Sequence, residues 1–214
     1  DTLSKIEPVD EAFFAKAKNR LDSLTKPLGS LGRLEELAQR ICSISRKDRP
    51  VLSNKVIFTL AADHGITQEG VSAYPSEVTP QMVFNFLRGG AGINVLARMV
   101  QARVIVVDMG VAADFDNVPG LIHSKIRKGT DNFAKGPAMS RDEAAMAVSA
   151  GIRLVEKELA KGLDIVGTGD MGIGNTTPSS AITAVMTGKS VAQVTGQGTG
   201  IEVGALSHKV RVIE

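Results

Sequence analysis

Three short apolar runs, each rich in β-branched side chains, alternate along the chain with segments of helical periodicity. The runs are residues 56–61, 103–108 and 163–167. Their composition is typical of strands that are buried on both faces. Strands that alternate with helices form a parallel sheet through right-handed crossovers. The sequence therefore predicts an α/β fold with a doubly wound, mainly parallel, Rossmann-like sheet and helices on both of its faces.

The helices expected around these strands are residues 79–87, residues 91–99, a helix from Ser140, and a helix from Asn175 to about Met186. Ser140 and Glu143 have the spacing of a capping box, which marks a helix start. Residues 110–139 contain many turn-forming residues, so we expect an extended loop there with a short strand near residues 122–126.

The first 50 residues have a different pattern. Apolar side chains recur at helical spacing over residues 9–24 and again over 34–44. The Pro and Gly residues of segment 26–32 separate the two stretches, because neither residue continues a helix. We expect a helical hairpin from a smaller helical domain over residues 1–50, followed by an incomplete α/β domain over residues 51–214.

The charge balance excludes several classes of partner. The chain has 25 basic and 23 acidic residues, so it lacks the basic footprint of a protein that binds nucleic acid or an anionic membrane. No apolar run approaches the ~20 residues that span a bilayer, and the polar N-terminus does not resemble a signal peptide. The single cysteine, Cys42, lies on an apolar helix face and is expected to be a buried thiol. We expect a cytoplasmic protein with neither nucleic acid nor membrane as a partner.

The segment after the third strand carries the clearest chemical signal. Four glycines between residues 167 and 174 allow positive φ and let peptide N–H groups approach an anion. The helix expected from Asn175 adds free N–H groups and a partial positive charge, and Thr176 and Thr177 add hydroxyl groups. No lysine follows the glycines, unlike in a Walker A loop, and a dinucleotide fingerprint would follow the first strand. The segment predicts a phosphate site; the alternative is a turn that only packs a helix on a strand.

An acidic residue and an imidazole, Asp63 and His64, follow the first strand. They are candidates for acid–base catalysis or metal binding, because ligands of open parallel sheets lie beyond the carboxyl ends of the strands. In the alternative, Asp63 caps the next turn and His64 makes a backbone hydrogen bond. The lack of a second His or Cys at a useful spacing argues against a metal site. His123 and His208 are expected at the surface or in an interface.

Residues 74–81 form a turn that leads into a helix. In one interpretation the turn is a lip over the pocket, where Tyr74 or Gln81 touches a flat ligand. In the other it is a capped helix start, with Thr79 as the N-cap and Pro80 at the first helical position. The two interpretations are compatible.

Lys209 follows a second glycine-rich turn, residues 197–200, by one helical span. It reaches a phosphate as a point charge, or it is a solvated surface lysine. The pattern alone favours the surface lysine.

Several of these segments together resemble one family, the nicotinate-nucleotide–dimethylbenzimidazole phosphoribosyltransferases. Each segment alone is a weak signal, but the set follows the order of the family over nearly the whole chain. The matching stretches are LTKPLGSLGRLE (24–35), ADHG (62–65), YPSEVTPQMV (74–83), GGAGIN (89–94), GPAMS (136–140), GIGNTT (172–177) and GTGI (198–201).

The resemblance implies that nicotinate mononucleotide transfers its ribosyl phosphate to 5,6-dimethylbenzimidazole. The products are nicotinate and α-ribazole phosphate, the nucleotide of the lower ligand of cobalamin. The resemblance implies neither a cofactor nor a metal, and it suggests a homodimer, for which the helices near residues 79–99 offer apolar surface. The sequence does not fix the acceptor base, since several candidate bases are flat.

By resemblance, Gly172, Asn175, Thr176 and Lys209 hold the phosphate and ribose of the mononucleotide. Asp170 matches an acidic position beside the ribose, where the family usually has a glutamate with one more methylene. The stretch that lines the benzimidazole pocket of the family contains three further candidates, which are Tyr74, Gln81 and Met82.

Members of the family continue well past the position of Glu214, and the glutamate that serves as their general base lies in that part. Three strands are also few for a doubly wound sheet. We therefore expect an N-terminal fragment that contains no catalytic residue, with the general base beyond Glu214. Such a fragment is expected to be nearly inactive, because a general base contributes about 10²–10⁴-fold to the rate. The alternative is a related α/β protein that binds a nucleotide without transferring it.

Overall fold

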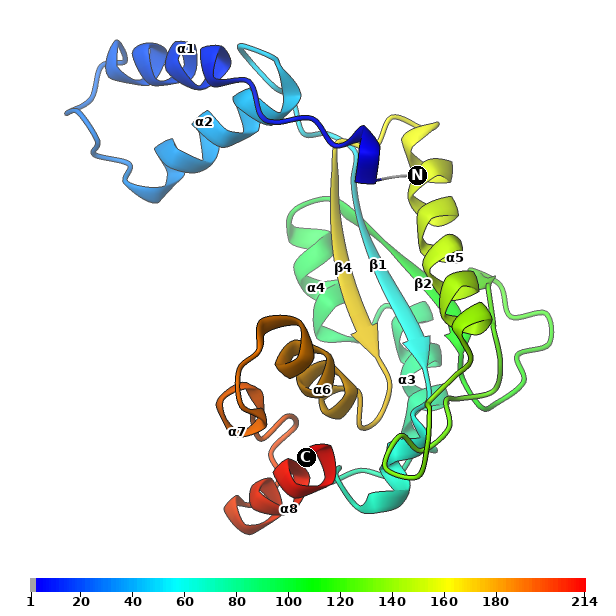
Figure 1. Ribbon diagram of the computed structural model, residues 1–214. Helices are drawn as coiled ribbons and strands as arrows, with labels where there is room; N and C mark the ends of the chain where they lie inside the picture. Colours follow the sequence, from blue (N-terminus) through cyan, green and yellow to red (C-terminus); the bar gives the residue numbers. More distant parts are fainter. Residues whose placement is uncertain (1–2) are drawn as a thin grey trace. The chain divides into compact units, whose positions relative to one another are not determined.

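The computed structural model describes residues 3–214, which form two compact units divided between Ser53 and Asn54. The elements of the first unit are the short 3-10 turn η1 (Leu3–Lys5) and the helices α1 (Glu11–Asp22) and α2 (Arg33–Ser45). The two helices pack on each other as a hairpin (Figure 1). Ser43 Oγ of α2 donates a hydrogen bond of 2.7 Å to the Asp10 carbonyl just before α1. The helical hairpin expected from the sequence is confirmed.

A buried ion pair holds the loop between these two helices. Lys26 Nζ lies 2.7 Å from Glu35 Oε1, and the same oxygen accepts a hydrogen bond of 3.1 Å from the Leu31 peptide N–H. The hydrogen bond from Lys26 lowers the pKa of the Glu35 carboxyl. Gly29 and Gly32 have φ values of +69° and +53°, a region that side-chain-bearing residues rarely adopt. The shape of the loop between α1 and α2 therefore explains the two glycines and the ion pair in segment 24–35.

The second unit is built on a four-stranded sheet. Its strands are β1 (Lys55–Ala62), β2 (Ala102–Gly110), β3 (Leu121–His123) and β4 (Ile165–Met171). They lie in the order β3-β2-β1-β4, and every pairing between neighbours is parallel. The chain moves outward from β1 in one direction and returns past it to β4, which is the doubly wound connectivity predicted from the sequence.

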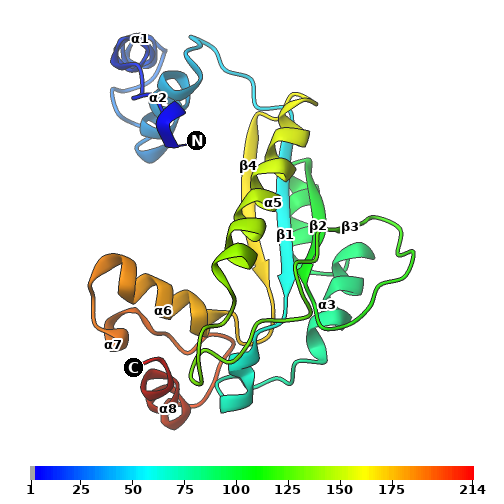
Figure 2. The same cartoon turned by 45° about the vertical axis from the view of Figure 1, so that its right-hand side comes forward.

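Helices cover both faces of this sheet. The helical elements of the unit are η2 (Gly65–Glu69), α3 (Val78–Leu87), α4 (Gly92–Met99), α5 (Arg141–Leu159), α6 (Thr176–Thr187), α7 (Val191–Val194) and α8 (Val203–Ile213). α3 and α4 connect β1 to β2, and α5 runs across the sheet toward β4 (Figure 2). At the start of α5, Ser140 Oγ accepts a hydrogen bond of 3.1 Å from the Glu143 peptide N–H, which confirms the predicted capping box.

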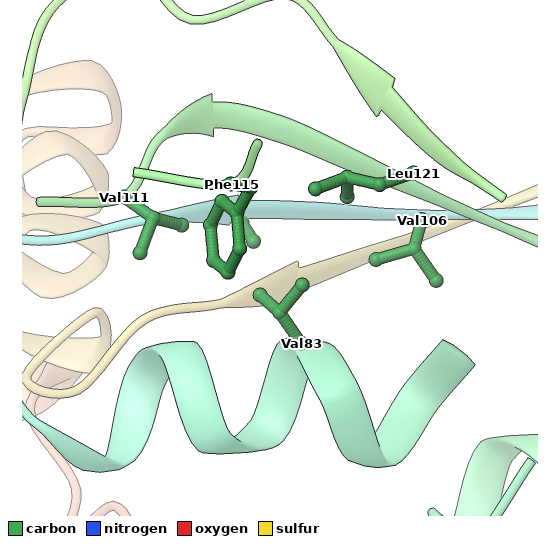
Figure 3. Close-up of a cluster of buried hydrophobic side chains, with 6 residues drawn as sticks. Val83, Val106, Val111, Phe115 and Leu121 are labelled. Atoms are coloured by element: carbon green, nitrogen blue, oxygen red, sulfur yellow. The ribbon is translucent and has the colours of Figure 1, made fainter. Parts of the chain in front are cut away.

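Two apolar clusters fill the layers on either side of the sheet. On one face, Val83 of α3 meets Val106 of β2 and Phe115 of the following loop (Figure 3). On the other face, Leu154 of α5 packs with Val107. Val106 and Val107 are neighbours in the chain and point to opposite faces, as residues in a strand do. Within residues 3–214 no helix is long and apolar enough to cross a membrane.

The fourth strand differs from the expectation. The sequence predicts a strand at residues 163–167 and a glycine-rich turn after it, but β4 runs to Met171, and Gly167 and Gly169 lie within it. They pair with Ile57 and Thr59 of β1. A Cβ on Gly167 would lie only 3.3 Å from the Ile57 side chain, so the missing side chain permits this close pairing. Pairing with the long β1 outweighs the weak strand preference of glycine.

Two smaller boundaries also differ. The short strand expected near residues 122–126 is β3 at Leu121–His123. Helix α3 begins at Val78 after Glu77, so Thr79 lies in its first turn and is not the N-cap. The local pattern suggested a cap, but the Thr79 hydroxyl instead accepts a hydrogen bond from the distant Ile173 peptide N–H.

Candidate functional site

The candidate site lies at the carboxyl edge of the sheet, where β1 and β4 end side by side. η2 follows β1 there, and α6, α7 and α8 follow β4 (Figures 1 and 2). His208 Nε2 of α8 lies 2.6 Å from the Glu69 carbonyl oxygen at the end of η2, so the last helix is joined to the segment after β1. His208, expected at the surface or in an interface, is thus half-buried within this unit, whereas His123 is exposed.

The turn from β4 into α6 depends on two of the four glycines. Gly174 has a φ of +83°, whereas Gly167, Gly169 and Gly172 have no positive φ, so the expectation for those three was wrong. Gly172 is required for a different reason. A Cβ on Gly172 would lie 1.9 Å from the Ala62 carbonyl oxygen, because the end of β1 passes directly against the turn.

The same turn presents donors that an anion would satisfy. Within the described residues, the peptide N–H groups of Gly174 and Thr176 donate no hydrogen bond. They stand at the N-terminus of α6, where the helix dipole adds partial positive charge. Asn175 Nδ2 donates to the Asp170 carbonyl at 3.2 Å and closes the turn over the end of β4. The turn therefore has the geometry of an anion site.

Lys209 is buried, with 1% of its surface exposed, so the surface-lysine interpretation is wrong. Its Nζ donates to Thr176 Oγ1 at 2.6 Å and to the Gly196 carbonyl at 3.4 Å. No carboxylate among residues 3–214 lies within ion-pair distance of it, and burial lowers the pKa of its ammonium group. A buried cation without a counter-ion is costly, so this position favours an anionic ligand.

Five of the predicted residues line one cavity of about 180 Å³. They are Asp170, Gly172, Asn175, Thr176 and Lys209. Its other lining includes Thr199 of the second glycine-rich turn. In that turn Gly198 has a φ of +62°, and a Cβ there would lie 2.8 Å from Thr176 Oγ1. The two glycine-rich turns and α8 thus enclose the same small space, into which several polar groups project.

A larger cavity of about 650 Å³ shares two of these residues, Asp170 and Asn175. Its wall is mainly apolar and includes Phe133, Met139 and Ile182. This volume falls in the range of small-molecule sites, about 300–1,000 Å³, and such sites combine apolar walls with few polar groups. Asp170 and Asn175 therefore stand where a polar and an apolar compartment meet.

His64 also lines the larger cavity, beside Asp170. Burial lowers the pKa of the His64 imidazole, and the nearby Asp170 carboxylate opposes this shift. Burial likewise raises the pKa of the Asp170 carboxyl, opposed by the His64 imidazole and by the Asn175 side-chain amide next to it. Within the described residues, His64 Nε2 is buried and has no hydrogen-bond partner. The backbone hydrogen bond suggested for this imidazole is therefore absent from that nitrogen.

The sequence did not point to the pairing of His64 with Asp170, an electrostatic interaction between two side chains that line one cavity and share no hydrogen bond within residues 3–214. Asp170 was expected in a turn, but it lies in β4. It pairs there with Leu60 of β1, and Leu60 is four residues before His64. The sequence could have indicated their proximity in principle. Asp170 is near the end of β4 and His64 is just after β1, and neighbouring parallel strands end at the same edge of a sheet.

Asp63 is held by the segment after β2 and does not cap the next turn. Its Oδ2 accepts a hydrogen bond of 2.8 Å from the Ala112 peptide N–H. That segment is held in turn by Lys125, which donates to the Val111 carbonyl at 2.8 Å and lies 3.2 Å from Asp108 Oδ2. A buried network thus fixes the end of β1, and with it the backbone that carries His64.

Tyr74, Gln81 and Met82 lie apart from these cavities. None of the three is among the residues that line the 180 Å³ or the 650 Å³ cavity, and Tyr74 is 53% exposed. They occupy the segment before α3 and its first half. The structure therefore brings five of the eight predicted residues together, and the role of the other three stays a prediction.

Replacing Asp170 by Asn should lower the pKa of His64 further, because it removes the carboxylate that favours the imidazolium form. An NMR titration of the imidazole measures this shift. Since the folded-state pKa of His64 lies below its ordinary value of 6.5, the unfolded chain binds more protons between the two values, and stability falls as pH falls through that range. Asp170→Asn should increase this loss. The exposed Asp114→Asn is the control, and an unchanged His64 pKa in Asp170→Asn would contradict the pairing.

The fold is a doubly wound parallel sheet. At its carboxyl edge lie the N-terminus of a helix and a buried lysine that has no carboxylate partner within residues 3–214. This combination is typical of α/β proteins that bind phosphorylated ligands. A family model described as phosphoribosyltransferase matches residues 6–214, and the chain belongs to this family.

Individual relatives agree with this assignment. The chain is 61% identical to the nicotinate-nucleotide–dimethylbenzimidazole phosphoribosyltransferase of Geotalea uraniireducens, and 59% identical to that of Geobacter sulfurreducens. Each match covers 100% of this chain and 61% of the relative. The crystal structure of CobT from Thermus thermophilus is similar with a TM-score of 0.90 and 45% identity, over 94% of this chain and 61% of that one. The chain thus spans about three fifths of the length of these relatives.

The general base expected beyond Glu214 lies outside the described residues. Glu214 directly follows α8, and its peptide N–H donates to the Val210 carbonyl at 3.1 Å. The relatives are longer than this chain, but their lengths alone do not assign a role to any residue. The position of a general base past Glu214, and the low activity of this chain alone, therefore stay predictions.

Proposed function

We propose that this chain is the donor-binding part of an enzyme that transfers ribosyl phosphate from nicotinate mononucleotide to 5,6-dimethylbenzimidazole. The products would be nicotinate and α-ribazole phosphate. The observation that carries the proposal is Lys209, a buried ammonium group that faces a small polar cavity without a carboxylate partner among residues 3–214. The names of the relatives support the choice of donor and acceptor.

In this proposal the phosphate of the donor occupies the 180 Å³ cavity. Lys209 supplies the charge, Thr176 supplies a hydroxyl group, and the free N–H groups of Gly174 and Thr176 supply backbone donors. Charge-assisted hydrogen bonds of this kind are stronger than neutral ones. The ribose then extends toward Asp170 at the edge of the larger cavity.

In this proposal Asp170 lies beside the ribose and its reacting carbon. As nicotinate leaves, C1′ develops positive charge, and a carboxylate next to it in a low-dielectric pocket stabilises that charge more than water would. The remaining contribution is proximity, since phosphate anchoring holds C1′ at a fixed distance from the acceptor. The acceptor pocket, with Tyr74, Gln81 and Met82, and a homodimer through exposed apolar residues of α4 such as Leu96 and Met99, belong to the same proposal.

Calorimetry with three ligands tests the proposal. Nicotinate mononucleotide should bind, nicotinate riboside should bind far more weakly because it lacks the phosphate, and nicotinate alone should not bind measurably. Equal affinity for the mononucleotide and the riboside would reject the phosphate site. Formation of α-ribazole phosphate from the bound donor distinguishes a transferase from a protein that only binds the nucleotide, and sedimentation of the protein reports its oligomeric state.

A further inference from the structure

Thr79 is fully buried, although threonine in the first turn of a helix is usually solvated. Its Oγ1 accepts a hydrogen bond of 3.1 Å from the Ile173 peptide N–H, 94 residues further along the chain. Ile173 lies inside the turn from β4 into α6, between Gly172 and Gly174. The contact therefore joins α3 to the turn of the candidate phosphate site.

We infer that Thr79 is a positioning residue that orients this turn for binding phosphate. The inference rests on the proposed function, and it assigns a role to a residue that lines neither of the two cavities.

The peptide N–H groups of the turn form two sets, those that donate a hydrogen bond and those that donate none within residues 3–214. Ile173 N–H points to Thr79, and Asn175 N–H returns to the Gly172 carbonyl at 3.0 Å. The N–H groups of Gly174 and Thr176 have no partner within residues 3–214. The Gly172 carbonyl and the Ile173 N–H belong to one peptide plane, so these two hydrogen bonds fix that plane, and the N–H groups of Gly174 and Thr176 are left for the anion.

The packing of α3 holds the Thr79 hydroxyl in place. Val83 lies one helical turn further along α3, is completely buried, and packs against the strands (Figure 3). The hydrogen bond between Ile173 and Thr79 is buried, and a buried amide is normally paired. If the hydroxyl is removed, the amide must stay unpaired or turn toward another acceptor, and either change disturbs the anion donors next to it.

The test compares Thr79→Val, which keeps the shape but removes the acceptor, with Thr79→Ser, which keeps the acceptor. Calorimetry should show that Thr79→Val binds nicotinate mononucleotide about five- to 150-fold more weakly, while its affinity for nicotinate riboside is unchanged. Thr79→Ser should restore binding to within a few fold. The matched control is Ser43→Ala, which deletes another buried hydroxyl bond, 2.7 Å to the Asp10 carbonyl, within the first unit.

Equal mononucleotide affinity of Thr79→Val and the unaltered protein would overturn the inference, and so would failure of Thr79→Ser to rescue. An equal loss for riboside and mononucleotide would assign Thr79 a general structural role instead. If the unaltered protein itself does not distinguish the two ligands, the proposed function fails.

Amide hydrogen exchange in the unaltered protein tests the inference without any variant. The Ile173 amide should exchange much more slowly than that of Gly174. Equal exchange of the two amides would show that the hydrogen bond from Ile173 to Thr79 does not order the turn.

Discussion

Lys209→Met should weaken the binding of nicotinate mononucleotide by about 30- to 5,000-fold, because truncating one partner of a buried, hydrogen-bonded charge pair costs about 2–5 kcal/mol. The same substitution should stabilise the protein without ligand. In that state the ammonium group has only neutral partners within residues 3–214, Thr176 and the Gly196 carbonyl, and methionine fills a similar volume without the cost of burying a charge. Opposite effects on stability and binding are the signature of a group retained for its ligand.

Thermal unfolding without ligand and calorimetry with the mononucleotide measure the two effects. The control is Lys128→Met, which removes an exposed lysine paired with Asp114 and should change neither quantity appreciably. The pH dependence provides a second check. The pKa of Lys209 is lower in the folded protein, so the unfolded chain binds more protons between that value and 10.5, and stability without ligand rises with pH there as binding weakens. A Lys209→Met protein that is less stable but binds normally would contradict the assignment.

Gly172→Ala should abolish donor binding and lower the free energy of unfolding by about 3 kcal/mol, at the upper end of overpacking effects. The new Cβ would lie 1.9 Å from the Ala62 carbonyl oxygen and 2.8 Å from His64 Nε2. The carbonyl belongs to the backbone at the end of β1, so it cannot move aside as a side-chain tip can. The turn must shift instead, and the shift moves Gly174 and Thr176 away from the proposed phosphate position.

The matched control is Gly151→Ala in α5, where nothing lies within 4 Å of the added methyl group. It should stabilise the protein by about 0.5–1 kcal/mol, because alanine restricts the unfolded chain and favours a helix. Denaturant unfolding of both variants, with calorimetry on the same samples, gives the comparison. Similar stability and binding in Gly172→Ala and the unaltered protein would refute the close approach of β1 to the turn.

The fold was predictable because its determinants are local. The β-branched runs at residues 56–61 and 103–108, and the helical spacing after Ser140, are visible within short windows of sequence. The extent of β4 was not visible, because it depends on pairing with a strand more than 100 residues away. Gly167 and Gly169 therefore suggested a turn, although the sheet holds them as strand residues.

The site was predictable only in part, for a related reason. The glycines and threonines around Asn175 indicated a phosphate site by themselves. The burial of Lys209 depends on packing against Thr176 and the turn near Gly198, so the local pattern favoured a surface lysine and only the family resemblance favoured a ligand. The role of Thr79 had no local signal, because a threonine before a proline has the same pattern whether it caps a helix or reaches across to a distant amide.

The two residues common to both cavities, Asp170 and Asn175, have a consequence for inhibitor design. A small anion in the polar compartment and an uncharged ring in the apolar one would touch the same pair of side chains. Each fragment must then change the affinity of the other by an equal factor, because such coupling is reciprocal. In a phosphonate that is tethered to a flat ring by a linker passing Asp170, binding of the ring becomes intramolecular once the phosphonate is bound. The gain in affinity would then depend on the length of the linker more than on new contacts.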